Sequence, residues 1–169
     1  MPPDLVSKED SNSVGESGVD DSVVSGLKAK ARDSGASESG EEGGLTIAII
    51  DGFLLFSEEM KEIRSLFDVR LFLRTDYQTA KTRREARSGY VTLEGFWKDP
   101  PHYVDRVVWP NYVKDHAFLF RDENVEGELN AEVCENLGIH AMPREAMGNM
   151  TECVKWACGT MEAAVQRIR

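Results

Sequence analysis

The sequence has little or none of several features that would each point to a class of protein. Its 169 residues include only three cysteines, without a Cys-x-x-Cys pair, which excludes a disulfide scaffold and indicates reduced thiols. No apolar run of about 18 residues and no charged leader is present, so we expect no signal peptide and no membrane span. Basic residues are in deficit, because the net charge is −10. Nucleic acid is therefore not an expected partner. We expect a cytoplasmic protein, with the nucleus as an alternative compartment.

A phosphate-binding loop is also absent. The motif Gly-x-x-x-x-Gly-Lys-[Ser/Thr] places backbone N–H groups, a lysine and a hydroxyl around the phosphates of a nucleotide. No glycine in this sequence is followed by lysine, so the motif does not occur. These residues therefore cannot hold a nucleotide's phosphates in this particular way.

Residues 1–44 contain no aromatic residue and no isoleucine. Serine, glycine and acidic residues dominate there, and ten acids against four bases give the segment a charge of −6. Such a segment cannot bury enough apolar surface to offset the entropy lost on ordering. We therefore predict a disordered acidic segment over residues 1–44 and one folded domain over residues 45–169.

The strongest structural signal is residues 45–56, Leu-Thr-Ile-Ala-Ile-Ile-Asp-Gly-Phe-Leu-Leu-Phe. An unbroken apolar run that ends at Asp51 and Gly52 is typical of a strand buried in a parallel sheet. Ligands bind beyond the carboxyl ends of such strands, so this strand would carry Asp51 to a site. Apolar residues followed by an acid also match the Walker-B pattern, whose acid holds Mg²⁺ or orients the nucleophile. The alternative is that Asp51 and Gly52 form only a turn.

The rest of the chain alternates between strand-like and helix-like patterns. We predict a second strand over 69–73, followed by a helix that is capped by Asp76, runs to residue 88 and is ended by Gly89. A loop over 90–102 precedes a helix that starts near Tyr103 and is interrupted at Pro110. The last predicted elements are a short helix over 131–137, a short strand over 138–142, and a final helix after Pro143 with a Met-rich stripe for core or docking contacts. This alternation predicts an α/β fold with a parallel sheet flanked by helices.

A basic run, Lys81-Thr-Arg83-Arg84-Glu-Ala-Arg87, falls in the helix predicted after Asp76. Arg83 and Arg87 are four residues apart and share a helix face, where an anion between them would relieve their repulsion. Arginines on a helix over a phosphate site can act as a lid that stabilises charge on a transferring phosphoryl group. The alternative is that cations in the last turn are stabilised by the helix dipole with no ligand.

A third signal is Tyr103-Val-Asp-Arg-Val-Val-Trp-Pro-Asn-Tyr112, in which we interpret Trp109 and Tyr112 as core anchors. Together with residues 49–56 and the basic run, it resembles the nicotinamide riboside kinases, a branch of the uridine-kinase-like P-loop kinases. The strong part of the resemblance covers less than half of the chain. It implies a partial P-loop NTPase-type sheet and ATP-dependent phosphorylation of the 5′-hydroxyl of a small nucleoside, nicotinamide riboside, in NAD synthesis.

The resemblance also implies the roles of individual residues. The family's Mg²⁺ is held mainly by phosphates and water, so no protein metal ligand is expected. The implied roles are Asp51 near the metal and the attacking hydroxyl, Arg83 and Arg87 on the ATP phosphates, Arg84 and Tyr90 on the riboside, and the loop over 138–143 with His140 and Met142 beside the adenine.

By the same resemblance the chain corresponds to the C-terminal portion of a kinase, because the family's phosphate loop and its general-base aspartate lie upstream. We therefore expect no turnover by residues 1–169 alone. We also expect marginal stability, because apolar strand edges would stay unpaired. Two alternatives remain open at this point: another uridine-kinase-like nucleoside kinase, or a non-catalytic nucleotide-binding or regulatory remnant. The sequence leaves the oligomeric state open.

Overall fold

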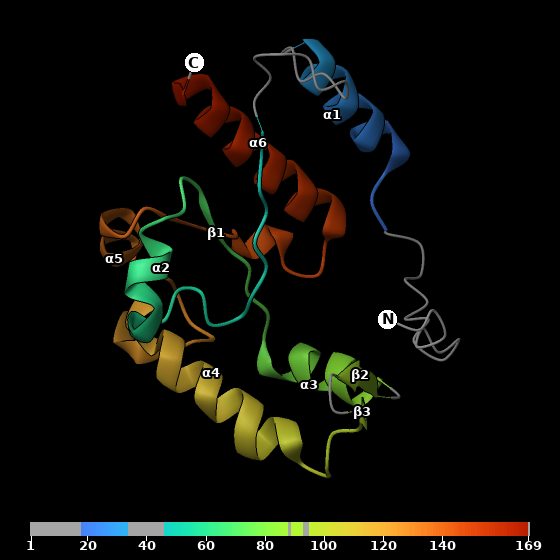
Figure 1. Ribbon diagram of the computed structural model, residues 1–169, viewed down its shortest axis with the longest axis vertical. Coiled ribbons are helices and arrows are strands. Elements are labelled where there is room, and N and C mark those ends of the chain that lie inside the picture. Colours follow the sequence, from blue (N-terminus) through green and yellow to red (C-terminus); the bar gives the residue numbers. More distant parts are fainter. Residues whose placement is uncertain (1–17, 34–45, 88, 93–94, 169) are drawn as a thin grey trace. The chain divides into compact units, whose positions relative to one another are not determined.

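The computed structural model describes residues 18–33, 46–87, 89–92 and 95–168 (Figure 1). The chain divides into two compact units. Of the described residues, 75–128 form one unit, here called the arginine unit, and the remainder form the other, here called the sheet unit. Most of the segment predicted to be disordered, residues 1–17 and 34–44, lies outside the described residues.

The sheet unit is built on two parallel strands. Strand β1, Arg70–Phe72, pairs with β4, Ile139–Ala141, with Arg70 opposite Ile139 and Phe72 opposite Ala141. The ladder extends one step further, because the Met142 N–H donates to the Phe72 carbonyl at 2.8 Å. The strands predicted over 69–73 and 138–142 are thus confirmed, and so is the α/β class with a small parallel sheet.

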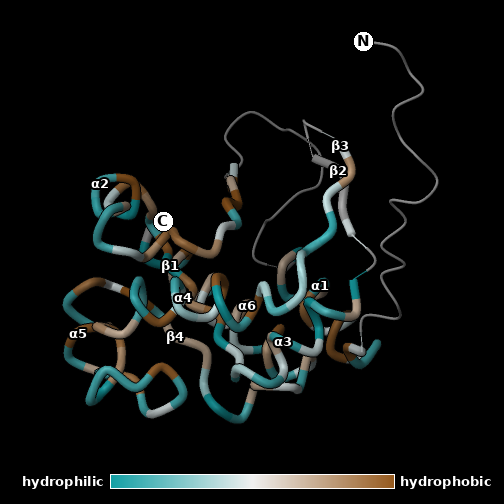
Figure 2. Tube along the Cα trace, turned by 90° about the horizontal axis from the view of Figure 1, so that it is seen from below, coloured by the Kyte–Doolittle hydropathy of each residue, from teal (hydrophilic) through white to brown (hydrophobic). Residues whose placement is uncertain are grey.

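The core of the sheet unit forms around these strands. Helix α5, Ala131–Asn136, begins at Asn130, whose side chain accepts the Val133 N–H at 3.3 Å. Hydrophobic and hydrophilic residues are mixed along this helix (Figure 2), so that one side can face the core. The Phe56 and Phe72 rings meet edge to face at 6.0 Å. The buried apolar side chains of this unit are Phe56, Phe72, Cys134, Ile139, Met142 and Ala146.

Two short helical turns follow the apolar segment, η1 at Glu58–Met60 and α2 at Lys61–Arg64. Arg64 is only 7% exposed. Its Nη1 donates to the Phe56 carbonyl at 2.8 Å, and its Nη2 pairs with the Glu58 carboxylate at 3.0 Å. A buried cation needs such partners to offset its lost hydration. Arg64 therefore ties the chain after Phe56 to this core.

The strand predicted over residues 45–50 is wrong for the part that the structure describes. Residues 46–50 form no strand, and Ile47, Ile49 and Ile50 are 53%, 86% and 60% exposed. An apolar segment becomes a buried strand only when its N–H and C=O groups pair with a neighbour. Within the described residues β1 pairs only with β4, and no strand lies beside 46–50 to pair with it.

A second correction concerns the N-terminal segment. Residues 21–33, predicted to be disordered, form helix α1, Asp21–Asp33. Val23, Val24 and Leu27 are half-buried and give α1 an apolar face, which is the physical reason that it forms. It runs beside the predicted C-terminal helix, α6, Met150–Ile168 (Figure 1). Thr151 joins them, because its hydroxyl oxygen accepts the Asp20 N–H at 3.1 Å.

The arginine unit is mostly helical and contains one hairpin. Its elements are α3 at Tyr77–Glu85, β2 at Tyr90–Thr92, β3 at Gly95–Trp97, a π-helical turn η2 at Val104–Val108, α4 at Trp109–His116, and the short turns η3 at Ala117–Leu119 and η4 at Arg121–Glu123. The loop predicted over 90–102 is therefore partly wrong, because β2 and β3 pair there antiparallel, with Tyr90 opposite Trp97. Valine, threonine and aromatic residues favour strands, and Gly95, at φ +127°, permits the turn.

The helix predicted near Tyr103 begins as the wide turn η2 and continues as α4. Pro110 lies in the first turn of α4, directly after the π-helical turn η2, so the helix changes type before the proline and does not end there. The rings of Trp109, Tyr112 and His116 follow one another with centroids 5.0 and 4.7 Å apart. Trp109 and Tyr112 are half-buried, so they pack against neighbouring rings at the edge of the core and are not enclosed within it.

Candidate functional site

Helix α3 begins as its sequence predicts. The Asp76 carboxylate accepts the Thr79 N–H at 2.8 Å and the Thr79 hydroxyl at 2.8 Å. These bonds, the backbone one first, lower the pKa of Asp76 because they favour its ionised form. The cap fixes where the helix starts and therefore which faces its basic residues occupy.

A hollow of about 500 Å³ lies at the end of α3. It is open to solvent on one side and is bounded by the residues that follow α3 and by the loop before η2. Gly89 is required in its wall, because its φ is +132° and an added Cβ would come within 2.7 Å of the Trp97 carbonyl oxygen. The residues that line the hollow include Arg84, Arg87, Lys98, Asp99, His102 and Tyr103.

Arg84 is held in this wall by a carboxylate. Its Nε and Nη2 donate to the two oxygens of Asp99 at 2.6 and 3.2 Å, and Trp97 Nε1 donates to the same carboxylate at 3.0 Å. The Arg84 guanidinium also lies over the Tyr103 ring, 5.3 Å from its centroid. Arg84, ahead of Trp97, lowers the pKa of Asp99, and Arg87 adds a smaller effect of the same sign. The Asp99 carboxylate is therefore ionised at neutral pH.

A second carboxylate, Asp105 in η2, gathers three side chains. Its Oδ1 accepts the Tyr77 hydroxyl at 2.5 Å and Lys81 Nζ at 2.6 Å, and its Oδ2 lies 3.2 Å from His102 Nδ1. Lys81 and then Tyr77 lower the pKa of Asp105 strongly. In turn, the bond to Asp105 raises the pKa of Tyr77 and of Lys81. Asp105, Tyr77 and Lys81 therefore keep their usual charges at neutral pH.

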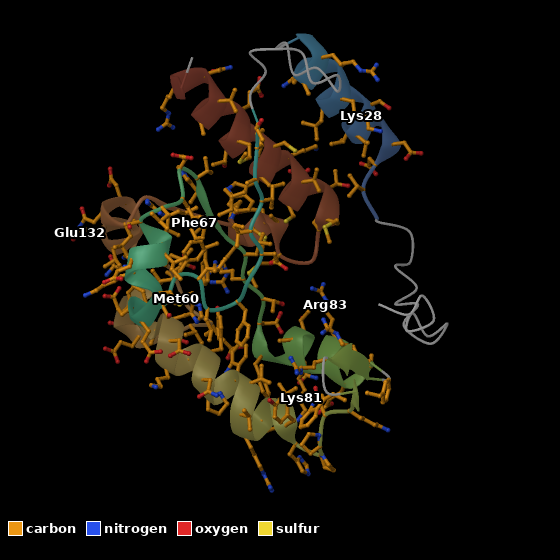
Figure 3. The ribbon with its side chains drawn as sticks, viewed as in Figure 1. Lys28, Met60, Phe67, Lys81, Arg83 and Glu132 are labelled. Carbon is orange, nitrogen blue, oxygen red and sulfur yellow. The ribbon has the colours of Figure 1, made fainter. Side chains whose placement is uncertain are left out.

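The predicted arginines lie together in this unit but differ in their surroundings. Arg83 is exposed, and it leaves α3 on a different side from Lys81 (Figure 3). Arg87 is exposed and lines the hollow, one residue beyond the cap of α3 at Ala86. Arg84 is half-buried in its pair with Asp99. Tyr90 opens β2, and its side chain lies outside the described part.

The other predicted site residues belong to the sheet unit. Asp51 is exposed and follows the unpaired residues 46–50. His140 is exposed on β4, whereas the Met142 side chain is 5% exposed and belongs to the core. Their proposed contacts with a metal, a hydroxyl or an adenine stay predictions.

Sequence reasoning missed Asp99 and the role of Asp105. Their partners on α3 are 15 to 28 residues away in the sequence, so no local spacing reveals them. The available signal was compositional: two aspartates in an aromatic and proline-rich segment, facing a run of basic residues.

A cluster of metal-ligating side chains is absent from the described residues. They contain no cluster of three or more histidine, cysteine or acidic side chains placed to hold a metal ion. Asp51 is therefore not part of such a cluster. Among the described helices, none has the length and apolar character needed to cross a membrane.

Known proteins similar to this chain share one name. A nicotinamide riboside kinase of Schizosaccharomyces pombe is 42% identical over 120 residues, which are 71% of this chain and 49% of that protein. One of Eremothecium gossypii is 44% identical over 85 residues, 50% of this chain and 34% of that protein. Human nicotinamide riboside kinase 2 is 37% identical over 84 residues, 50% of this chain and 33% of that protein. No family model matches the chain, and no solved structure matches it significantly.

The chain thus spans half or less of the length of these curated relatives. The matches agree in name across yeasts and mammals, at 37% to 44% identity. Over its aligned residues, this chain is similar to the nicotinamide riboside kinases.

Proposed function

We propose that this chain carries the arginine helix and the adjoining part of the substrate site of a nicotinamide riboside kinase, without the phosphate-binding loop. The observation that carries the proposal is the 42% identity over 120 residues with a protein of that name. The hollow beside α3 supports it, because three cations, two carboxylates and an aromatic ring line a concave surface there. Such a wall suits a small, charged and planar ligand.

In the proposed reaction, the γ-phosphoryl group of ATP passes to the riboside 5′-hydroxyl, which gives ADP and the 5′-phosphate and releases the hydroxyl proton. Arg83 and Arg87 would stabilise charge on the phosphates, because both guanidinium groups are exposed. Arg84 and Tyr90 would contact the riboside, Asp51 would approach the attacking hydroxyl, and His140 and Met142 would border the adenine. Mg²⁺ would supply charge neutralisation on the phosphates.

Residues 1–169 by themselves should not catalyse this reaction. Phosphoryl transfer depends on positioning and charge stabilisation, and the loss of one preorganised donor typically costs about 10²–10³ in rate. The missing loop would have supplied several donors and a lysine at once. We therefore expect ligand binding without measurable turnover.

Calorimetry with ATP and with nicotinamide riboside tests the proposal, alongside a product assay. We expect weak binding of both ligands and no 5′-phosphate. Substituting Arg83→Gln and Arg87→Gln should weaken ATP binding by roughly tenfold, as expected for the loss of charge-assisted hydrogen bonds. Arg121→Gln, an exposed residue in η4, is the matched control. Equal losses in the control, or no ATP binding in the wild type, would contradict the proposal.

A second candidate is a nucleotide-binding or regulatory protein that transfers nothing, and the absent loop favours it. Tight ATP binding without a preference among nucleosides would support that alternative. A panel of nicotinamide riboside, uridine and cytidine also separates the proposed substrate from that of another uridine-kinase-like enzyme.

A further inference from the structure

Helix α3 has no buried apolar face. None of its nine residues is buried, and its sequence Tyr-Gln-Thr-Ala-Lys-Thr-Arg-Arg-Glu is mostly polar. A helix of this length is unstable in water on its own. Burial of an apolar face therefore does not hold this helix, which instead makes several polar contacts.

The first half of α3 is held mainly from η2. The Tyr77 hydroxyl and Lys81 Nζ both donate to Asp105, at 2.5 and 2.6 Å. Lys81 and Asp105 are about a quarter exposed, so this pair is partly shielded from solvent. The Tyr77 ring also meets the Trp109 ring edge to face at 5.3 Å. The Tyr77 N–H donates to Glu126 at 3.0 Å, which adds a weaker, exposed contact.

The last turn of α3 is held from the loop that leads into η2. Asp99 takes both hydrogen bonds from the edge of the Arg84 guanidinium, and the Trp97 indole holds the Asp99 carboxylate from the other side. The side chains of Arg84 and Asp99 are 25% and 20% exposed. A bidentate pair of this kind fixes direction as well as distance.

These two contacts come from one short stretch, residues 99–105. The stretch is itself held in place, because the Tyr103 N–H donates to the Pro100 carbonyl at 3.1 Å and the Val104 side chain is buried, with 2% exposed. Tyr77, Lys81 and Arg84 follow one another at spacings of four and three, so they share one face of α3. Arg83 lies off that face and stays exposed.

We propose that Asp99 and Asp105 are positioning residues that clamp α3 at its two ends through one face and so hold Arg83 exposed on another side of the helix. The clamp itself stands on these contacts, whereas the use of the arginines for an anion rests on the proposed function. Because the clamp consists of charged, partly exposed contacts, α3 should loosen before the helices around it.

Amide hydrogen exchange of the full chain tests the clamp. In Asp105→Asn and in Asp99→Asn we expect the amides of α3 to exchange about tenfold faster, while those of α4 change less than about twofold. Asp105→Glu, which keeps the charge, should recover part of the protection. Asp122→Asn is the matched control, because Asp122 is exposed at φ +52°, where asparagine is tolerated. Equal acceleration of α3 and α4, or none, would overturn the clamp.

A salt titration of the wild type does not depend on the variants folding. Raising sodium chloride from about 0.05 to 1 M shortens the screening length, so α3 exchange should rise relative to α4 exchange. An unchanged ratio, or α3 amides without protection at low salt, would also refute the clamp.

Binding of inorganic triphosphate tests the role of the arginines. The Asp105→Asn variant should bind triphosphate several-fold more weakly than the wild type. Failure of the wild type to bind triphosphate while α3 is protected would overturn the anion role alone.

Discussion

The exposed segment 46–50 leads to a sharp contrast between two isoleucines. Removing a buried isoleucine side chain down to alanine typically costs about 2–5 kcal/mol. Ile139 on β4 is 5% exposed, so Ile139→Ala should cost about 3 kcal/mol of unfolding free energy. Ile49 is 86% exposed, so only about a seventh of its side-chain surface is buried in the folded chain. Ile49→Ala should therefore cost about 0.4 kcal/mol of unfolding free energy, about a seventh of the cost at Ile139.

Urea denaturation followed by far-ultraviolet circular dichroism measures both changes. The substitution is the same at the two positions, so side-chain chemistry cancels and only burial differs. If the transition is broad, limited proteolysis gives the same ranking from the population of open chains. A cost at Ile49 above about 1.5 kcal/mol would refute the reasoning, because it would mean that this segment is a packed strand.

Three further changes test other contacts. Asp76→Ala should cost about 1 kcal/mol, measured in urea, because the Thr79 N–H loses its cap, whereas Asp76→Asn should cost less. Thr151→Val should speed amide exchange in α1 about fivefold, because the Asp20 N–H loses its acceptor. Acidification should release the hairpin from α3, because folding lowers the pKa of Asp99 from its usual 3.8. The stabilisation that ionised Asp99 gives to the folded chain is complete above the usual pKa and is lost as the pH falls through the lowered pKa. Trp97 fluorescence should therefore change below about pH 4 and stay constant between about pH 5 and 8.

Local signals were enough for the parts of the fold that local contacts decide. Asp76 caps α3 through a residue three positions away, and the strand at β4 is followed by a core methionine and a proline. The apolar run over 46–50 looked equally clear. Its state depends on a neighbouring strand, however, and no pattern within the run can supply that partner.

The same distinction holds for the candidate site. The spacing of Arg83 and Arg87 predicted a shared helix face, but α3 ends at Glu85, so Arg87 lies beyond the helix. The partners of Arg84 and Lys81 could not be predicted, since Asp99 and Asp105 reach them only after the hairpin folds back. Helix α1 was the avoidable error: Val23, Val24 and Leu27 form a short amphipathic pattern inside a polar segment.

The wide turn η2 makes the chain tolerant of a change in length at one particular point. A π-helical turn contains one residue more than the α-helical turn that would replace it. The extra residue is absorbed within the turn, so deleting one residue between Asp105 and α4 would leave the parts on either side in nearly the same rotation about the helix axis. The Asp105 carboxylate would then still face Tyr77 and Lys81. The same deletion within α4 would rotate everything before it by about 100° relative to the rest of that helix. A deletion should therefore be tolerated in η2 and not in α4.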